Sequence, residues 1–142
     1  MSVLDMVQAI KDQISGLWRR IAELDELISD LTTTIKEQSD AYDQIGLSRD
    51  SLRTNLTQNA DRARGRADSF SSRALQMAFK ELIAKGDKIC EEQDAEIGSI
   101  LTQCQDEINA NDGKKQSYQT ERNTLGNEIS RLNASLSTYG EE

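Results

Sequence analysis

The sequence predicts an all-α protein, an elongated antiparallel helical hairpin or coiled coil in which two long helices pack side by side. Apolar residues recur in alternating steps of four and three from residue 3 to residue 56, a pattern that indicates a long helix with one buried seam. A second ladder of this kind covers residues 97–139. The chain also lacks proline, the residue that most strongly interrupts helices. One helix cannot bury its own seam, so we expect the two to cover each other.

The first ladder predicts a seam helix over residues 1–57. Its sixteen positions are apolar except Gln38 and Arg49, and they run Val3, Val7, Ile10, Ile14, Leu17, Ile21, Leu24, Ile28, Leu31, Ile35, Gln38, Tyr42, Ile45, Arg49, Leu52 and Leu56. Rows of isoleucine and leucine in this arrangement also occur in parallel two-stranded coiled coils, so a homodimer is an alternative. Trp18 and Leu27 flank the seam where such dimers usually carry Glu and Lys, and this favours a wider contact with more than one helix.

A polar stretch at residues 58–69 predicts the elbow of the hairpin, within a single helical domain spanning 1–142. Gly65 is the expected point of reversal because glycine tolerates the backbone angles that a reversal needs. An elbow there pairs positions whose numbers add up to roughly 130, which places Arg49 near Glu81. Ser69 is the expected cap of the second helix.

The second helix is predicted over residues 70–140. The segment 109–113, Asn-Ala-Asn-Asp-Gly, is a candidate second break near residue 112. The apolar ladder keeps its phase across this segment, which favours a continuous or kinked helix over a full turn.

Composition argues against catalysis and against several kinds of partner. The chain has 142 residues, no histidine and two cysteines 14 residues apart, so Ser–His–Asp and Cys–His sites are excluded and zinc ligation is not expected. We therefore expect no enzyme, no metal site and no cofactor. A net charge of −8 disfavours nucleic acid. No apolar run reaches the roughly 18 residues of a membrane span, and the start resembles no Sec signal peptide. We expect a cytoplasmic protein whose export, if any, is Sec-independent.

The candidate partner-binding residues lie on the seam flanks and around the elbow. Residues 58–88 carry a net charge of +3. Within them Arg62, Arg64, Arg66 and Arg73 make a basic patch beside Phe70, which suits an exposed loop, docking onto an acidic protein surface or, least well, nucleic acid. The aromatic and methionine side chains that follow suit either core packing or a partner-facing cluster. The predicted set comprises Trp18, Leu27, Arg64, Gly65, Phe70, Met77 and Phe79.

The layout resembles that of the YwqH-like small helical proteins encoded beside LXG toxins of the type VII secretion system in Gram-positive bacteria, and more distantly that of WxG-type hairpins. The elbow of that family often carries Trp-x-Gly followed by an aromatic residue. The corresponding residues are Ala63, Arg64 and Gly65, followed by Phe70, so the glycine and the aromatic match and the tryptophan does not.

The resemblance implies a non-catalytic, chaperone-like targeting factor. Such a protein would bind the helical N-terminal domain of an LXG toxin, together with a second small helical protein, and form a composite bundle that the secretion machinery recognises. The alternative is a generic coiled-coil scaffold or assembly subunit that forms a homodimer through the same seam.

Overall fold

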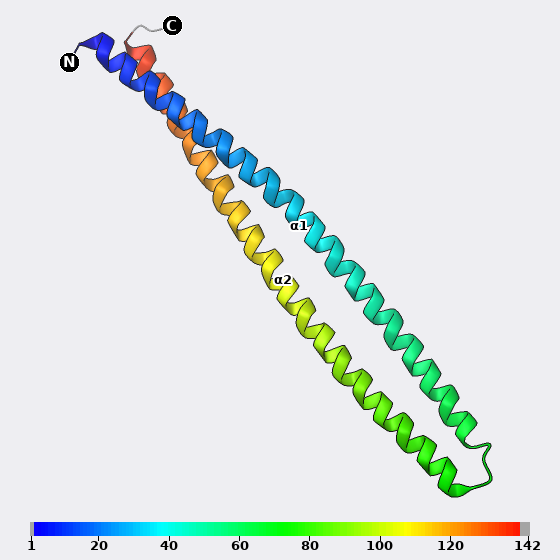
Figure 1. Ribbon diagram of the computed structural model, residues 1–142. Helices are drawn as coiled ribbons and strands as arrows, with labels where there is room; N and C mark the ends of the chain where they lie inside the picture. The colour runs from blue at the N-terminus through cyan, green and yellow to red at the C-terminus, as the bar shows by residue number, and fades with distance from the viewer. Residues whose placement is uncertain (1, 140–142) are drawn as a thin grey trace. The chain divides into compact units, whose positions relative to one another are not determined.

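The computed structural model describes residues 2–139, and these fold into two long α-helices (Figure 1). Helix α1 spans Val3–Ala67 and helix α2 spans Arg73–Thr138, with no strand in the described part of the chain. The two helices pack against each other, and the predicted all-α helical hairpin is confirmed. Residue 1 of the predicted first helix and residue 140 of the second lie outside the described range.

Contacts group the chain into two compact units, which we describe separately. Unit 1 combines the part of α1 up to Glu37 with the part of α2 from Ile108, and unit 2 is Gln38–Glu107. That residues 1–142 form one domain stays a prediction. No 18-residue stretch of either helix within residues 2–139 is apolar enough to cross a membrane.

Unit 1 buries the seam that the heptad pattern predicts. Leu24 is 0% exposed and is flanked in the ladder by the buried Ile21. From α2, Ile129 and Leu132 are buried in the same unit. Full burial of a leucine or isoleucine side chain is worth about 1.5–3 kcal/mol, so this apolar layer accounts for the pairing of the two segments.

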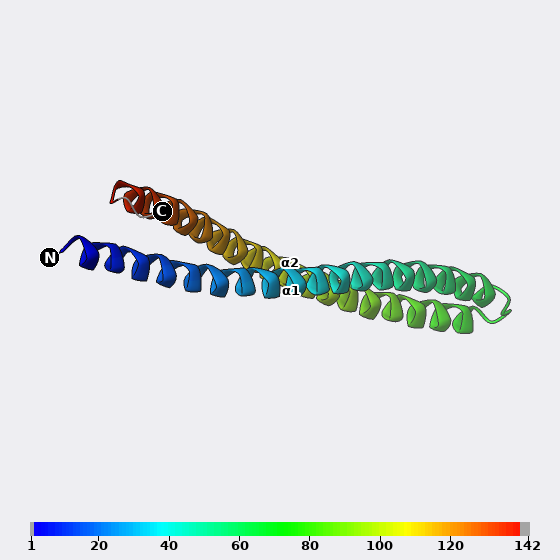
Figure 2. The ribbon, with the colours of Figure 1, turned by 90° about the horizontal axis from the view of Figure 1, so that it is seen from above.

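Unit 2 contains the chain reversal at residues 68–72, which joins the two helix ends in both views (Figures 1 and 2). The turn is held by backbone hydrogen bonds from the Ser69 amide to the Arg66 carbonyl, 3.1 Å, and from the Phe70 amide to the Ala67 carbonyl, 3.4 Å. Ala67 is buried beneath it. The reversal therefore uses serine-rich sequence and no glycine.

The predicted elbow at residues 58–69 around Gly65 is wrong in position. Helix α1 continues through residues 58–67, and Gly65 is helical, with open space where a Cβ atom would lie. Glycine costs only about 0.5–1 kcal/mol in a helix relative to alanine, which is too little to end a helix that other contacts support. The second helix accordingly begins at Arg73 rather than at residue 70.

The cap of α2 also differs from the prediction. Ser72, not Ser69, accepts a hydrogen bond through its hydroxyl from the Leu75 amide, 3.3 Å. The Ser69 hydroxyl instead donates to the Arg66 carbonyl at 2.7 Å and so closes the end of α1. Both serines satisfy backbone groups that a helix end leaves without partners.

The later reversal shifts the pairing of the two helices in unit 2. Arg49 contacts Asp94 of α2 rather than the predicted Glu81, and Glu81 forms an ion pair with Lys85 on its own helix. In unit 1, helix α2 runs through residues 109–113 without a turn, as the unbroken ladder favours.

Candidate binding surfaces

Trp18 and Leu27, the predicted flank residues, are exposed in unit 1. The Trp18 side chain is 55% exposed and Leu27 is 37% exposed. Nine residues on a helix amount to about two and a half turns, so the two side chains lie on opposite flanks of the seam. One partner helix lying along one flank would cover one of them.

Arg64 and Gly65, two further residues of the predicted set, lie in the last turn of α1. Arg64 forms ion pairs with Asp61 on its own helix and with Asp87 on α2. Gly65 presents only exposed backbone. Arg64 is therefore engaged in joining the two helices of unit 2.

Phe70 and Phe79 come together at the turn. Their rings stack with centroids 5.1 Å apart and planes inclined by 17°, a contact worth about 0.5–1.5 kcal/mol beyond the buried area. Both remain partly exposed, so they are neither a closed core nor isolated surface residues. Met77, the third residue of the predicted partner-facing cluster, is exposed and takes no part in this stacking.

A depression of about 640 Å³ opens beside the stacked rings. It is lined by both helices and the turn, through Asn59, Arg62, Ala63, Arg66, Ala67, Phe70, Phe79, Leu82 and Ile83. Leu82 is 62% exposed, one turn along α2 from Phe79. We call Arg62, Arg66, Phe70, Phe79 and Leu82 the turn patch.

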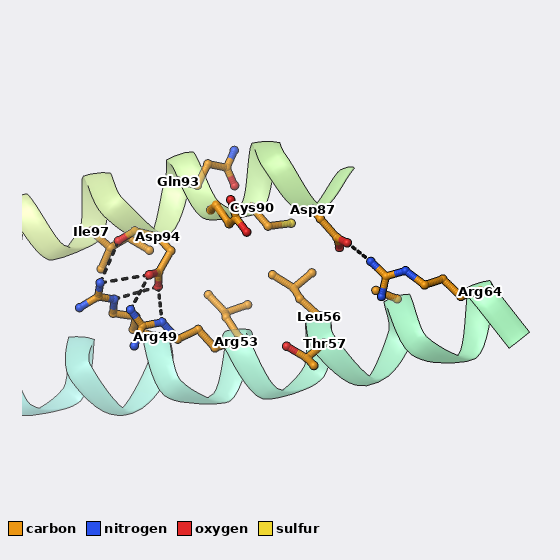
Figure 3. Close-up of a pocket in the computed structure, with 13 residues that line it drawn as sticks. Arg49, Arg53, Leu56, Thr57, Arg64, Asp87, Cys90, Gln93, Asp94 and Ile97 are labelled. Carbon is orange, nitrogen blue, oxygen red and sulfur yellow. Dashed lines mark hydrogen bonds and ion pairs between the residues drawn. The ribbon is translucent and has the colours of Figure 1, made fainter. Parts of the chain in front are cut away.

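A second cavity, the interhelical groove, has a volume of about 370 Å³ (Figure 3). Its lining comprises Arg49, Leu52, Arg53, Leu56, Thr57, Ala60, Arg64, Asp87, Cys90, Glu91, Gln93, Asp94 and Ile97. Leu52 occupies a seam position yet is 52% exposed, and Leu56 is similarly uncovered. The seam that is closed around Leu24 in unit 1 is thus open around Leu52 in unit 2.

Ion pairs flank this groove along both helices. Arg49 and Arg53 both reach the Asp94 carboxylate, and Arg64 reaches Asp87 (Figure 3). The Arg49 guanidinium donates to the Asp94 carboxylate at 2.9 and 3.1 Å and to the Asp94 carbonyl at 3.1 Å. Gly98 makes room for it, because a Cβ atom there would lie 2.9 Å from Arg49 Nη2.

The two guanidinium groups set the charge state of Asp94. Hydrogen bonds from Arg53 and then Arg49 hold the pKa of the Asp94 carboxyl well below its ordinary value, and the same contact raises the pKa of Arg53. A carboxylate with a lowered pKa is a weak general base. The arrangement is suited to holding the two helices of unit 2 together.

Residues 2–139 contain no group of three or more Cys, Asp or Glu side chains placed to hold a metal ion. Cys90 lines the groove as a free, half-buried thiol, and Cys104 is likewise half-buried and free.

Comparison with protein families, with curated proteins and with solved structures finds no match to this chain in any of the three. The site must therefore be judged on its own residues. From the basic patch the predicted partner-binding set took only Arg64 and left out Arg62 and Arg66, and it also left out Leu82, although all three line the depression together with Phe70 and Phe79. The four-residue spacing of the two arginines and the three-residue spacing from Phe79 to Leu82 are the signals that place each pair on one helix face.

Proposed function

We propose that this chain is a non-catalytic binding protein for another helical polypeptide. The observation that carries the proposal is the open seam of unit 2, where Leu52 and Leu56 stand at heptad positions but remain half exposed beside a groove. Exposed apolar side chains at heptad positions are what an additional helix covers in a bundle. The exposed Trp18 and Leu82 add apolar surface of the same kind.

The resemblance to YwqH-like proteins supports a more specific proposal about the partner. The partner would be the helical N-terminal domain of a type VII secreted LXG toxin, bound together with a second small helical protein. In this role the chain is a targeting factor, and its export with the toxin would be Sec-independent. A long two-helix protein with an open seam is physically suited to contribute to such a composite bundle.

Co-expression with the toxin domain tests this proposal. The toxin N-terminal domain and the second small helical protein, taken from the neighbouring reading frames, are produced together with the tagged full chain. We expect co-purification and a mass by light scattering equal to a defined complex. A chain that elutes alone under these conditions contradicts the proposal.

Two substitutions to glutamate, one in the groove and one outside it, test whether the groove binds the partner. Leu56→Glu places a carboxylate among the groove side chains and should weaken the complex by about tenfold or more, since the charged group loses its water when the partner covers the groove. Leu4→Glu introduces the same charge at an exposed residue of the first turn of α1 and should leave the complex intact. Helical content by circular dichroism verifies that both variants fold.

A homodimeric scaffold is the second candidate, favoured by the same open groove, which a second copy could also cover. It cannot use the isoleucine and leucine rows around Ile21 and Leu24, because these residues are already buried within unit 1. Light scattering of the isolated chain distinguishes the two: a stable dimer that Leu56→Glu dissociates favours the scaffold, and a monomer favours the heterologous partner.

A further inference from the structure

The turn patch combines an apolar centre with cations that form no ion pair within residues 2–139. Phe70, Phe79 and Leu82 supply the apolar centre, and Arg62 and Arg66 line the same depression from α1. Exposed aromatic and leucine side chains lose contact with water only when another molecule covers them.

The charges around the patch are unbalanced. All four acidic residues of segment 58–88 form ion pairs with cations of the same segment, namely Asp61 and Asp87 with Arg64, Asp68 with Lys80 and Glu81 with Lys85. Arg62 and Arg66 are exposed and take part in no ion pair within residues 2–139. No carboxylate of this segment remains to neutralise them.

We propose that the turn patch is the docking site for an amphipathic helix of a different protein, whose apolar stripe is bordered by carboxylates. This inference rests on the proposed function, a binder of helical polypeptides, and adds to the groove a second docking surface and the chemistry of the helix that it receives. Arg62 and Arg66 are one turn apart, about 6 Å along the helix axis. Glu or Asp side chains one turn apart on the partner match this spacing while its leucines cover Phe79 and Leu82.

A second copy of the chain fits this patch poorly. Turn-to-turn contact between two copies would bring Arg62 and Arg66 against the same arginines, and like charges at close range are repulsive. Docking the turn of one copy onto an acidic face of another would be a head-to-tail contact, which extends into filaments unless it closes.

An anionic membrane is also disfavoured. The Phe70 and Phe79 rings stack on each other within a depression walled by both helices, whereas membrane insertion requires apolar side chains that project outward into the acyl region.

Peptide binding to the full chain tests the inference. The probe is a fluorescent synthetic amphipathic helix with leucine at positions i, i+3, i+4 and i+7 and glutamate along both borders, and its matched control carries lysine at every glutamate position. Fluorescence anisotropy measures the affinity of each peptide. We expect the glutamate peptide to bind at least tenfold more tightly than the lysine peptide, because two charge pairs are gained in one case and two repulsions in the other.

Charge reversal in the protein provides the decisive comparison. Arg62→Glu combined with Arg66→Glu should weaken binding of the glutamate peptide about tenfold and strengthen binding of the lysine peptide. Arg19→Glu combined with Arg131→Glu makes the same change in net charge at exposed positions of unit 1 and should alter either affinity by less than about twofold, since screening over about 10 Å removes distant effects. Leu82→Asn should weaken both peptides.

Three results would overturn the inference. They are binding of the glutamate peptide that neither the arginine pair nor Leu82 affects, equal binding of both peptides, and no binding of either peptide. In the last case, arginine-dependent binding to phosphatidylserine vesicles would identify an anionic membrane as the ligand of the patch. Each of the three results leaves the proposed function separately testable, because the toxin complex is measured independently. A complex that forms and survives the Arg62 and Arg66 reversal places the partner elsewhere and refutes only the turn patch.

Discussion

Arg49, at a seam position of α1, and Asp94 of α2 form a multiply hydrogen-bonded ion pair. The guanidinium donates to both carboxylate oxygens and to the main-chain carbonyl of Asp94, all at 2.9–3.1 Å. Arg53, one turn further along α1, donates to the same carboxylate at 2.6 Å. This pairing fixes the register of unit 2, since a guanidinium held by three acceptors cannot slide along the partner helix without losing them.

The lowered pKa of Asp94 predicts a pH-dependent contribution to stability. Its pKa lies below the unfolded value of about 3.9, so the ionised group stabilises the folded state above pH 4 and this contribution is lost as the pH falls through the folded pKa. In Asp94→Asn the contribution is absent at every pH. We expect the variant to melt at a lower temperature than the wild type at pH 7, with the difference shrinking between about pH 5 and pH 2.

Thermal melts followed by circular dichroism across this pH range make the measurement. Asp50→Asn is the control, because Asp50 is exposed and approaches Arg53 only at 3.9 Å, and it should show no comparable pH dependence. A difference between wild type and Asp94→Asn that stays constant with pH would contradict the role assigned to Asp94.

The heptad pattern was sufficient to predict the helices and the hairpin, because burial of a periodic apolar stripe dominates the energetics of such a chain. The register was not predictable in the same way. Gly65 was the expected reversal point, but a helical glycine costs little, and the serine-rich turn at 68–72 supplies hydroxyls for both helix ends. A reversal a few residues later changed the partner of Arg49 from Glu81 to Asp94.

The candidate surfaces were predictable only in part, because the register of the two helices decides which side chains meet. Phe70 and Phe79 could be singled out as aromatic residues near the turn, but their stacking depends on where the chain reverses. Arg64 looked as available to a partner as Arg62 and Arg66. Its engagement by Asp87 follows from the register of the two helices, which local sequence does not specify.

Two glycines of α2 predict different responses to alanine. Gly113 has open space at its Cβ position, so Gly113→Ala should raise the free energy of unfolding by about 0.5–1 kcal/mol through helix propensity. At Gly98 the new methyl group would lie 2.9 Å from Arg49 Nη2, so the guanidinium must shift. We expect this shift to strain the hydrogen bonds of Arg49 to Asp94, so that Gly98→Ala gains less stability than Gly113→Ala.

A double variant separates these effects. In an Arg49→Met background the obstructing guanidinium is gone, and Gly98→Ala should recover the stabilisation seen for Gly113→Ala. Urea titrations of the four variants give the comparison. If Gly98→Ala stabilises the wild-type chain as much as Gly113→Ala does, the guanidinium is not held as the structure indicates.

The capping serines of the turn make a further prediction. Ser72→Ala removes the acceptor for the Leu75 amide and should lower the free energy of unfolding by about 1 kcal/mol, as expected for an N-cap. Ser69→Ala removes a donor to a carbonyl at an exposed helix end, where water can replace it, so its effect should be below about 0.5 kcal/mol. Equal losses in urea titrations of the two variants would show that Ser72 does not act as the cap of α2.

Truncation of one seam leucine in each unit should cost different amounts of stability, because the seam is closed around Leu24 and open around Leu52. Leu24 is fully buried in unit 1, so Leu24→Ala should cost about 3 kcal/mol through lost burial and an unfilled cavity. Leu52 is 52% exposed in unit 2, and Leu52→Ala should cost less than about 1 kcal/mol in the isolated chain because half of its surface already meets water.

A helical partner that covers the groove would bury Leu52. The Leu52→Ala variant should therefore weaken the complex while leaving the stability of the free chain nearly unaffected. Urea unfolding of the free chain and titration of the partner measure the two effects, and a Leu52→Ala variant that destabilises the free chain as strongly as Leu24→Ala would mean that the seam of unit 2 is closed without any partner.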